Sequence, residues 1–112
     1  MAVINNSVDD TIITGTSFDD TITNSGKRVT IYGGVGNENI DNTGDDCVIF
    51  VDSGDDSVIS SGKRTTIYGG TGNDTVSVSG DYSLVYLGAG TDSVNNSGAY
   101  NTIFAGADSD SI

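Results

Sequence analysis

The sequence predicts an all-β fold, a parallel two-sheet β-solenoid built from six coils of 18 residues. Three observations support this prediction. Apolar residues recur every 18 residues in two columns, which lie nine residues apart within each repeat. Each apolar residue lies in a short β-branched run, such as Thr65-Thr66-Ile67, and segments rich in Gly, Asn or Ser separate these runs, as in strands joined by turns. No apolar stripe of helical period is present, and glycine recurs too often for stable helices.

The repeats follow one another without insertion or deletion. After a short leader at residues 1–4, a single domain comprises the repeats 5–22, 23–40, 41–58, 59–76, 77–94 and 95–112. A repeat of this length cannot bury its own apolar face, so successive coils must stack, with paired strands about 4.8 Å apart. Three columns are expected to point into a thin core: Ile22, Ile40, Val58, Val76, Val94 and Ile112; Ile13, Ile31, Ile49, Ile67, Val85 and Ile103; and the small residues Thr11, Val29, Cys47, Thr65, Ser83 and Asn101.

The composition argues against several classes of protein. The 112 residues include 16 acidic and 4 basic side chains, a net charge of −12, which disfavours nucleic acid and anionic membranes as partners. The absence of histidine excludes a Ser-His-Asp triad, and the single cysteine excludes an internal disulfide and a structural zinc site. No apolar run is long enough to span a bilayer, and no signal peptide is visible at the N-terminus. We expect no enzymatic activity, since acidic pairs recur in every coil and a straight stack predicts no cleft.

Glycine and an acidic residue recur in one turn of each repeat. Residues 69–77 read Gly-Gly-Thr-Gly-Asn-Asp-Thr-Val-Ser, a full match to the nonapeptide G-G-x-G-x-D-x-U-x. Residues 33–40 match except for Glu38, while residues 52–58 and 88–94 keep the acid, at least one glycine and the final apolar residue. The two end turns match less well. The chain therefore resembles the RTX family, the haemolysin-type calcium-binding repeats of secreted bacterial toxins, proteases, lipases and surface proteins.

The resemblance implies a right-handed β-roll in which Ca²⁺ binds between turns on the same edge of successive coils. Each turn would supply backbone carbonyls and its acidic side chain. The best implied site lies between residues 69–74 and 87–92, followed by 51–56 with 69–74, and then by 33–38 with 51–56, where Glu38 departs from the pattern. The implied metal ligands are Asp20, Gly34, Gly36, Glu38, Gly54, Asp56, Gly69, Gly70, Gly72, Asp74, Gly88, Gly90, Asp92 and Asp110.

Physical chemistry favours a cation at these turns independently of the resemblance. Glycine permits the positive φ of a tight turn whose carbonyls face one side, and Ca²⁺ takes six to eight oxygen ligands. Acidic side chains stacked about 4.8 Å apart repel each other by about 0.9 kcal/mol per pair even at the dielectric constant of water. The alternative is that Asp, Asn and Gly are ordinary turn residues here, without any metal.

The other edge of the coils lacks the nonapeptide, and we expect no calcium there. Its charged pairs alternate from Asp9-Asp10 through Lys27-Arg28 and Asp45-Asp46 to Lys63-Arg64, which predicts a ladder of salt bridges between coils. Strand alternation turns two columns outward. The aromatic column begins with Thr14 and continues with Tyr32, Phe50, Tyr68, Tyr86 and Phe104. The smaller column beside it comprises Ile12, Thr30, Val48, Thr66, Leu84 and Thr102. This aromatic strip either supports itself by stacking or contacts another chain, a glycan or a neighbouring domain.

Two functions remain open at this point. The first is a calcium-binding structural repeat module of a secreted or surface bacterial protein, which folds and stiffens outside the cell, where sites of about 10⁻⁴–10⁻³ M are loaded. The second is a self-assembling fibre subunit with calcium optional. The last repeat stops in phase at Ile112 without a polar cap, so either the chain belongs to a longer array or its ends stack. The expected partners are calcium ions and further copies of the chain, which would associate end to end or through the aromatic strip, and the resemblance implies an extracellular or cell-surface location.

Overall fold

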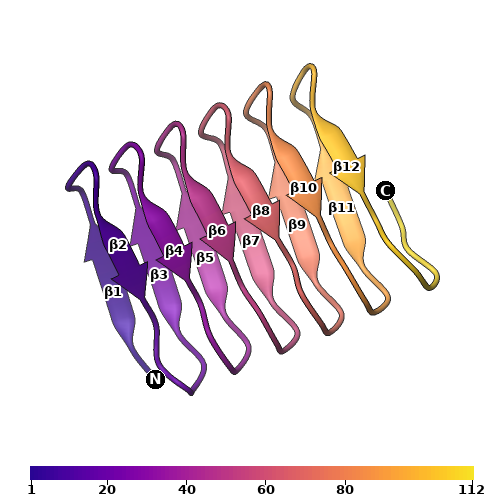
Figure 1. Cartoon of the computed structure of the whole chain (residues 1–112), viewed down its shortest axis with the longest axis horizontal. Coiled ribbons are helices and arrows are strands. Elements are labelled where there is room, and N and C mark those ends of the chain that lie inside the picture. Colours follow the sequence, from indigo (N-terminus) through magenta and orange to yellow (C-terminus); the bar gives the residue numbers. More distant parts are fainter.

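The computed structural model describes residues 1–112 as two parallel six-stranded sheets in a flat slab with extents of 36, 31 and 15 Å (Figure 1). Sheet A contains β1 (Val3–Asn6), β3 (Thr21–Asn24), β5 (Asn39–Asn42), β7 (Ser57–Ser60), β9 (Thr75–Val78) and β11 (Ser93–Asn96), in that order. Sheet B contains β2 (Ile12–Thr14), β4 (Thr30–Tyr32), β6 (Val48–Phe50), β8 (Thr66–Tyr68), β10 (Leu84–Tyr86) and β12 (Thr102–Phe104). The chain forms no helix that would reach across a membrane.

The strand register confirms the predicted two-sheet β-solenoid of 18-residue coils. Ile4 pairs with Ile22 in sheet A, and Ile13 pairs with Ile31 in sheet B, always one repeat apart. The prediction of a leader at residues 1–4 is wrong for its last two residues, because Val3 and Ile4 begin β1. Ile4 stands one period before Ile22, so the apolar column itself carries the signal for this strand.

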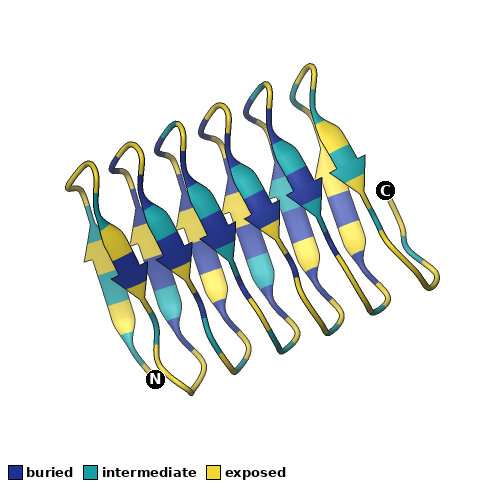
Figure 2. Ribbon diagram, viewed as in Figure 1, coloured by how far each residue is buried: buried dark blue, intermediate teal, exposed yellow.

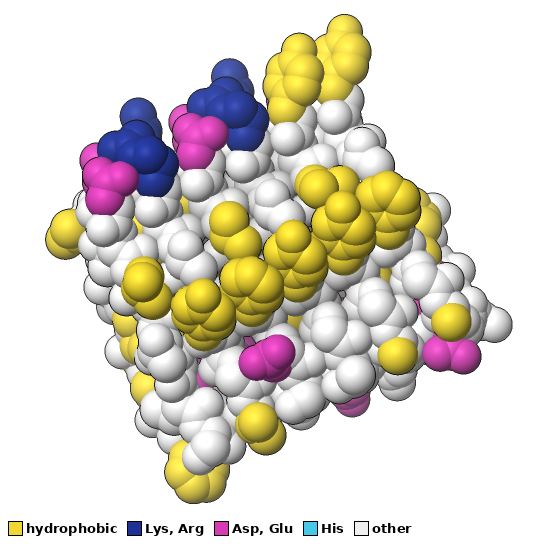
Figure 3. All heavy atoms as spheres, in the orientation of Figure 1, with side chains coloured by type: hydrophobic (Ala, Val, Ile, Leu, Met, Phe, Trp, Pro, Cys, Tyr) yellow, Lys and Arg dark blue, Asp and Glu magenta, His cyan; other side chains and the backbone are white.

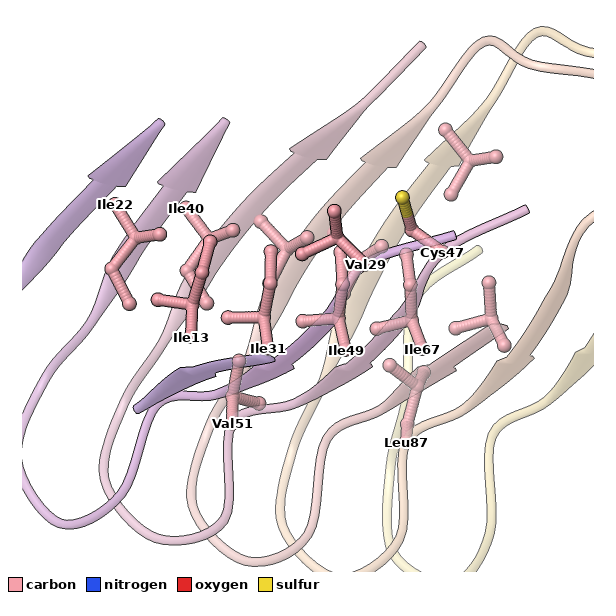
Figure 4. Close-up of a cluster of buried hydrophobic side chains, with 14 of the residues drawn as sticks. Ile13, Ile22, Val29, Ile31, Ile40, Cys47, Ile49, Val51, Ile67 and Leu87 are labelled. Atoms are coloured by element: carbon pink, nitrogen blue, oxygen red, sulfur yellow. The ribbon is translucent and has the colours of Figure 1, made fainter. Parts of the chain in front are cut away.

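The core is a single thin layer between the sheets, visible as a buried stripe across all coils but the last (Figure 2). The predicted columns are buried where a coil has neighbours on both sides. The small column is buried at Val29 and Cys47 (Figure 4), and likewise at Thr65 and Ser83. Burial raises the pKa of the Cys47 thiol, as expected for a small apolar core residue rather than a reactive one. Ile112 was expected inside, but it lies beyond the last strand and is 69% exposed.

Two further buried columns were not predicted. One lies at the end of each sheet A strand, where the buried amide of Asn24 donates to the Asn42 side-chain oxygen at 2.8 Å and to the Gly26 carbonyl at 3.0 Å. The other lies just after each sheet B strand and contains the fully buried Val51 and Leu87. Because buried polar groups need partners, the asparagine stack holds its place in the core only through these bonds.

Candidate metal site

The turns that carry the glycines share one backbone conformation in all coils but the first. Gly70 and Gly72 have φ values of 84° and 117°, and Asp52 and Gly54 take the same two positions with φ values of 68° and 130°. The degenerate repeats therefore keep the turn of the full nonapeptide. Asp52 stands at a glycine position there, and its positive φ strains a residue that has a side chain. We call the edge formed by residues 15–20, 33–38, 51–56, 69–74, 87–92 and 105–110 the turn edge.

Successive turns are in direct backbone contact. The Thr71 N–H donates to the Asp52 carbonyl at 2.8 Å, and the Gly72 N–H donates to the Ala89 carbonyl at 3.2 Å. A Cβ added at Gly72 would lie 1.8 Å from the Gly54 carbonyl oxygen of the preceding coil. Glycine is thus required here both by its positive φ and by the approach of the next turn.

The acidic column of the turn edge is buried, which the sequence pattern did not predict. Its members Asp20, Glu38, Asp56, Asp74 and Asp92 are each only 1–2% exposed. Three of the interior acids accept a hydrogen bond from the backbone of the preceding coil: the Glu38 N–H donates to Asp56 Oδ1 at 2.7 Å, and the Asp56 N–H donates to Asp74 Oδ1 at 3.0 Å. The Asp74 N–H donates likewise to Asp92 Oδ1 at 2.8 Å. The carboxylates therefore form a continuous row along the stack.

Four carboxylates in this row retain oxygens without a hydrogen-bond partner. These buried atoms are Oδ2 of Asp56, Asp74 and Asp92 and both side-chain oxygens of Glu38. Burial raises the pKa of Asp74 to about 7. Burial and the adjacent Asp56 charge raise the pKa of Glu38 to about 8. Desolvation disfavours the charged form, so the row attracts either protons or a cation.

No basic side chain neutralises this row. We call the edge formed by the other set of turns, such as residues 7–11 and 25–29, the opposite edge, and it carries all four basic residues, Lys27, Arg28, Lys63 and Arg64. There, Arg28 pairs with Asp10 and Arg64 pairs with Asp46 at 2.6 Å. The row of buried carboxylates therefore lacks a counter-charge from the protein itself.

The full nonapeptide at residues 69–74 brings oxygens of two coils together. A Cβ at Gly69 would meet the Leu87 carbonyl oxygen at 2.6 Å and the unpartnered Asp74 Oδ2 at 2.7 Å. Because Gly69 has no side chain, both oxygens lie beside its α-carbon, whereas Val51 and Leu87 fill the equivalent position in neighbouring coils. A hard oxygen-loving cation fits this donor set, namely carboxylates together with carbonyls.

No three acidic, histidine or cysteine side chains converge on one point. A cation here would therefore take most of its ligands from the backbone. Several predicted carbonyl ligands are engaged between coils: the Gly34 carbonyl accepts from the Ser53 N–H at 3.4 Å, and the Gly70 carbonyl accepts from the Ala89 N–H at 3.0 Å. The remaining predicted glycines, Gly36, Gly54, Gly88 and Gly90, lie in the same turns with positive φ.

The two end acids differ from the interior row. Asp20 accepts bonds from the Thr16 N–H at 2.6 Å, the Thr16 hydroxyl at 2.7 Å and the Ala2 N–H at 2.8 Å. The bond from the Thr16 backbone is the main cause of a lowered Asp20 pKa. Asp110 is half-buried, and its Oδ1 accepts from the Asp92 N–H at 2.9 Å. Asp20, although predicted as a ligand, thus has its hydrogen bonds supplied by its own turn and by Ala2, just before β1.

A second ladder, which sequence reasoning missed, runs on the outside of the turn edge. The side-chain oxygen of Asp19 accepts from the Asn37 N–H at 2.8 Å, and that of Asn37 accepts from the Asp55 N–H at 2.9 Å. Asp55 and Asn73 continue the pattern at 2.9 Å. The recurrence of Asp or Asn directly before the first four buried acids was the available signal. This outer ladder gives those residues a structural role that needs no metal.

The predicted salt-bridge ladder of the opposite edge is discontinuous. Ion pairs join Asp10 with Arg28 and Asp46 with Arg64, but no ion pair joins Arg28 with Asp46. The next two coils place Tyr82 against Tyr100, with ring centroids 5.1 Å apart. The ion pairs and the tyrosine pair of this edge therefore join the coils two by two, while backbone hydrogen bonds join every coil to the next.

We expect the Arg64→Met substitution to lower the free energy of unfolding by less than about 1 kcal/mol, because exposed ion pairs contribute little. The side chains of Arg64 and Asp46 are 52% and 40% exposed. Urea denaturation measures the change, and Lys63→Met, which removes a cation that forms no ion pair, is the matched control. A loss of several kcal/mol specific to Arg64 would show that the pair holds the coils in register.

No protein-family model, curated protein or solved structure matches this chain. The likeness to the RTX repeats therefore depends on the residues of the turn edge alone. The geometry and charge of the turn edge are the basis for any assignment of function.

Proposed function

We propose that the chain is a calcium-binding structural repeat module whose coils fold and stiffen when Ca²⁺ binds between successive turns. The observation that carries this proposal is the row of four buried carboxylates with unpartnered oxygens and no basic side chain beside them. A divalent cation of high oxygen affinity would supply the missing positive charge and would be coordinated by the unpartnered oxygens.

The energetics require some form of neutralisation. A folded domain is stable by only about 5–15 kcal/mol, whereas burying one unpaired carboxylate costs several kcal/mol. Four such groups can remain ionised in the fold only beside a cation. At acid pH protons neutralise the row instead, because the pKa of Glu38 and that of Asp74 are raised to about 8 and about 7.

The ligands would come from neighbouring turns. Between residues 69–74 and 87–92, Asp74, Asp92 and the Leu87 carbonyl would hold the ion. Between residues 51–56 and 69–74, Asp56 and Asp74 would do so. Glu38 and Asp56 would serve the third gap, where both Glu38 oxygens lack partners. Asp74 thus contributes to two sites, which couples neighbouring coils.

The resemblance to RTX repeats supports placing the module in a secreted or surface protein of a bacterium. Extracellular calcium modules bind at about 10⁻⁴–10⁻³ M, far above the calcium level of a bacterial cytosol. The chain would therefore remain loosely structured inside the cell and become rigid outside, because binding free energy of sites absent from the unfolded chain is folding free energy.

The test is far-UV circular dichroism at a pH of about 9, above the pKa of about 8 at which Glu38 loses its proton. We expect a strand spectrum in millimolar calcium and its loss in excess chelator. Magnesium at the same concentration is the matched control, since it carries the same charge but demands stricter octahedral geometry. A strand spectrum that is identical with calcium and with chelator would contradict the proposal.

A second candidate is a fibre subunit that stacks end to end with calcium optional. The observation in its favour is that β1 and β2 at one end, and β11 and β12 at the other, each have only one neighbouring strand. Open strand edges pair readily with other chains, and head-to-tail pairing propagates into filaments. Negative-stain microscopy at raised protein concentration tests it, and discrete particles at every calcium level would exclude it.

A further inference from the structure

The outer face of sheet B carries no charged residue, although the chain has a net charge of −12. Its outward side chains are the two columns of the aromatic strip, and Figure 3 shows this strip crossing the broad face from the first coil to the last. Of these residues, Tyr32, Tyr68 and Phe104 are 42%, 37% and 51% exposed. An apolar surface of this extent is characteristic of an interaction site.

The aromatic rings are stacked on one another along the strip. Ring centroids of Tyr32, Phe50, Tyr68, Tyr86 and Phe104 lie 4.8–5.2 Å apart, with interplanar angles of 5–7°. The faces of the interior rings are therefore covered by their neighbours, and only ring edges and tyrosine hydroxyls point outward. Stacking of a sugar on an aromatic face is therefore not available to the interior rings.

We propose that a second copy of this chain covers sheet B, in a face-to-face dimer. The strip repeats at the spacing of the coils, and another copy is a surface with the same period. Charge supports this pairing, because the two edges differ strongly. The opposite edge carries all four basic residues and only five acids, Asp9, Asp10, Asp45, Asp46 and Asp81. The turn edge carries no basic residue and ten acids: Asp19, Asp20, Glu38, Asp52, Asp55, Asp56, Asp74, Asp92, Asp108 and Asp110.

Shape and charge select the same two-fold axis. An axis that runs along the stack, within the interface, places the aromatic column of one copy over the smaller column of its partner. The same axis places each acidic turn edge beside the partner's opposite edge, where the basic residues lie. An axis along the strands would instead bring ring onto ring and one acidic edge onto the other. The first axis is favoured because it keeps the two acidic edges apart, since the opposite edge carries nearly as many basic as acidic residues.

The face is large enough for such a contact. The broad side of the whole molecule measures 36 by 31 Å, and a standard interface buries about 800 Å² per partner. The dimer does not require bound calcium, since none of the residues of the strip belongs to the turn edge. It is also closed, so it predicts one discrete larger species and not a growing fibre.

Sedimentation velocity from micromolar to millimolar protein tests the dimer, under conditions in which circular dichroism shows the strand spectrum. Thr66→Glu places a charge in the smaller column without removing a stacked ring, and Ser77→Glu places the same charge on the outer face of sheet A. Both sites have uncharged cross-strand neighbours. We expect wild type and Ser77→Glu to dimerise alike, and Thr66→Glu to have a dissociation constant at least about tenfold higher.

Nuclear magnetic resonance of the wild-type chain gives a second readout that needs no variant. Amide shifts of β4, β6, β8 and β10 should change with concentration, while those of sheet A should not. A monomer up to millimolar concentration, equal behaviour of the two variants, or open-ended growth would each overturn the proposal.

Discussion

In excess chelator, the stability of the chain is expected to fall as the pH rises from about 4 to about 8. The folded state holds protons on Glu38 and Asp74 with pKa values of about 8 and about 7, against ordinary values of 4.5 and 3.8. At a pH between the ordinary and the raised pKa of each group, the unfolded chain has released the proton that the folded chain retains. The folded state then binds more protons than the unfolded state, so the free energy of unfolding decreases with pH.

The loss is on the order of several kcal/mol, since one unit of pKa shift corresponds to about 1.4 kcal/mol. It is complete once the pH exceeds the pKa of Glu38 in the folded chain. Urea denaturation at a series of pH values measures it. Calcium should abolish the fall of the unfolding free energy with pH at the alkaline end of this range, because a bound cation replaces the protons. A chelated protein equally stable across this range would contradict the buried-row interpretation.

Asp74→Asn should have opposite effects with and without calcium. Asparagine keeps an oxygen that can accept the Asp56 N–H but removes a buried charge, so the chelated variant should be more stable than wild type at a pH of about 8. In calcium the same variant should gain less stability than wild type, because two sites lose a carboxylate. Asp55→Asn is the control, as it changes an exposed acid of the same edge. Equal behaviour of the two variants would show that Asp74 is not a ligand.

Gly72→Ala should destabilise the array by roughly 3–5 kcal/mol, which is enough to unfold it in many conditions. Two causes combine: φ is +117°, and the new Cβ would lie 1.8 Å from the Gly54 carbonyl oxygen. The neighbouring coil could yield only by breaking the backbone bonds that join the turns. Thermal unfolding by circular dichroism measures the effect with calcium and with chelator.

Thr71→Ala is the matched control for this substitution. The Thr71 side chain is exposed, and the backbone hydrogen bonds of Thr71 to the preceding coil do not depend on that side chain. We expect a change within about 0.5 kcal/mol, as for most surface substitutions. If Gly72→Ala were tolerated as well as Thr71→Ala, the turns would not be in the close contact described here.

Much of the fold could be predicted because every residue has its neighbours exactly one period away. The columns of Ile22 and Ile13 predicted both sheets and their register, and strand alternation correctly placed Val29 and Cys47 inside. The prediction was less complete at the coil ends. Strand alternation from Ile22 and Val85 also points Asn24 and Leu87 inward, but their columns mix residue types, as in Asn24, Ser60 and Val78, so no recurring apolar residue marked them.

By itself, the sequence determined that the chain is a stack of two-sheet coils with glycine turns and acids collected along one edge. Only the tertiary structure decided that those acids are buried, that Asp56, Asp74 and Asp92 each keep one oxygen without a partner, and that Asp20 does not. The reason is physical. A repeat specifies which residues stack, whereas burial and hydrogen bonding in a turn depend on backbone dihedral angles and on the coils above and below.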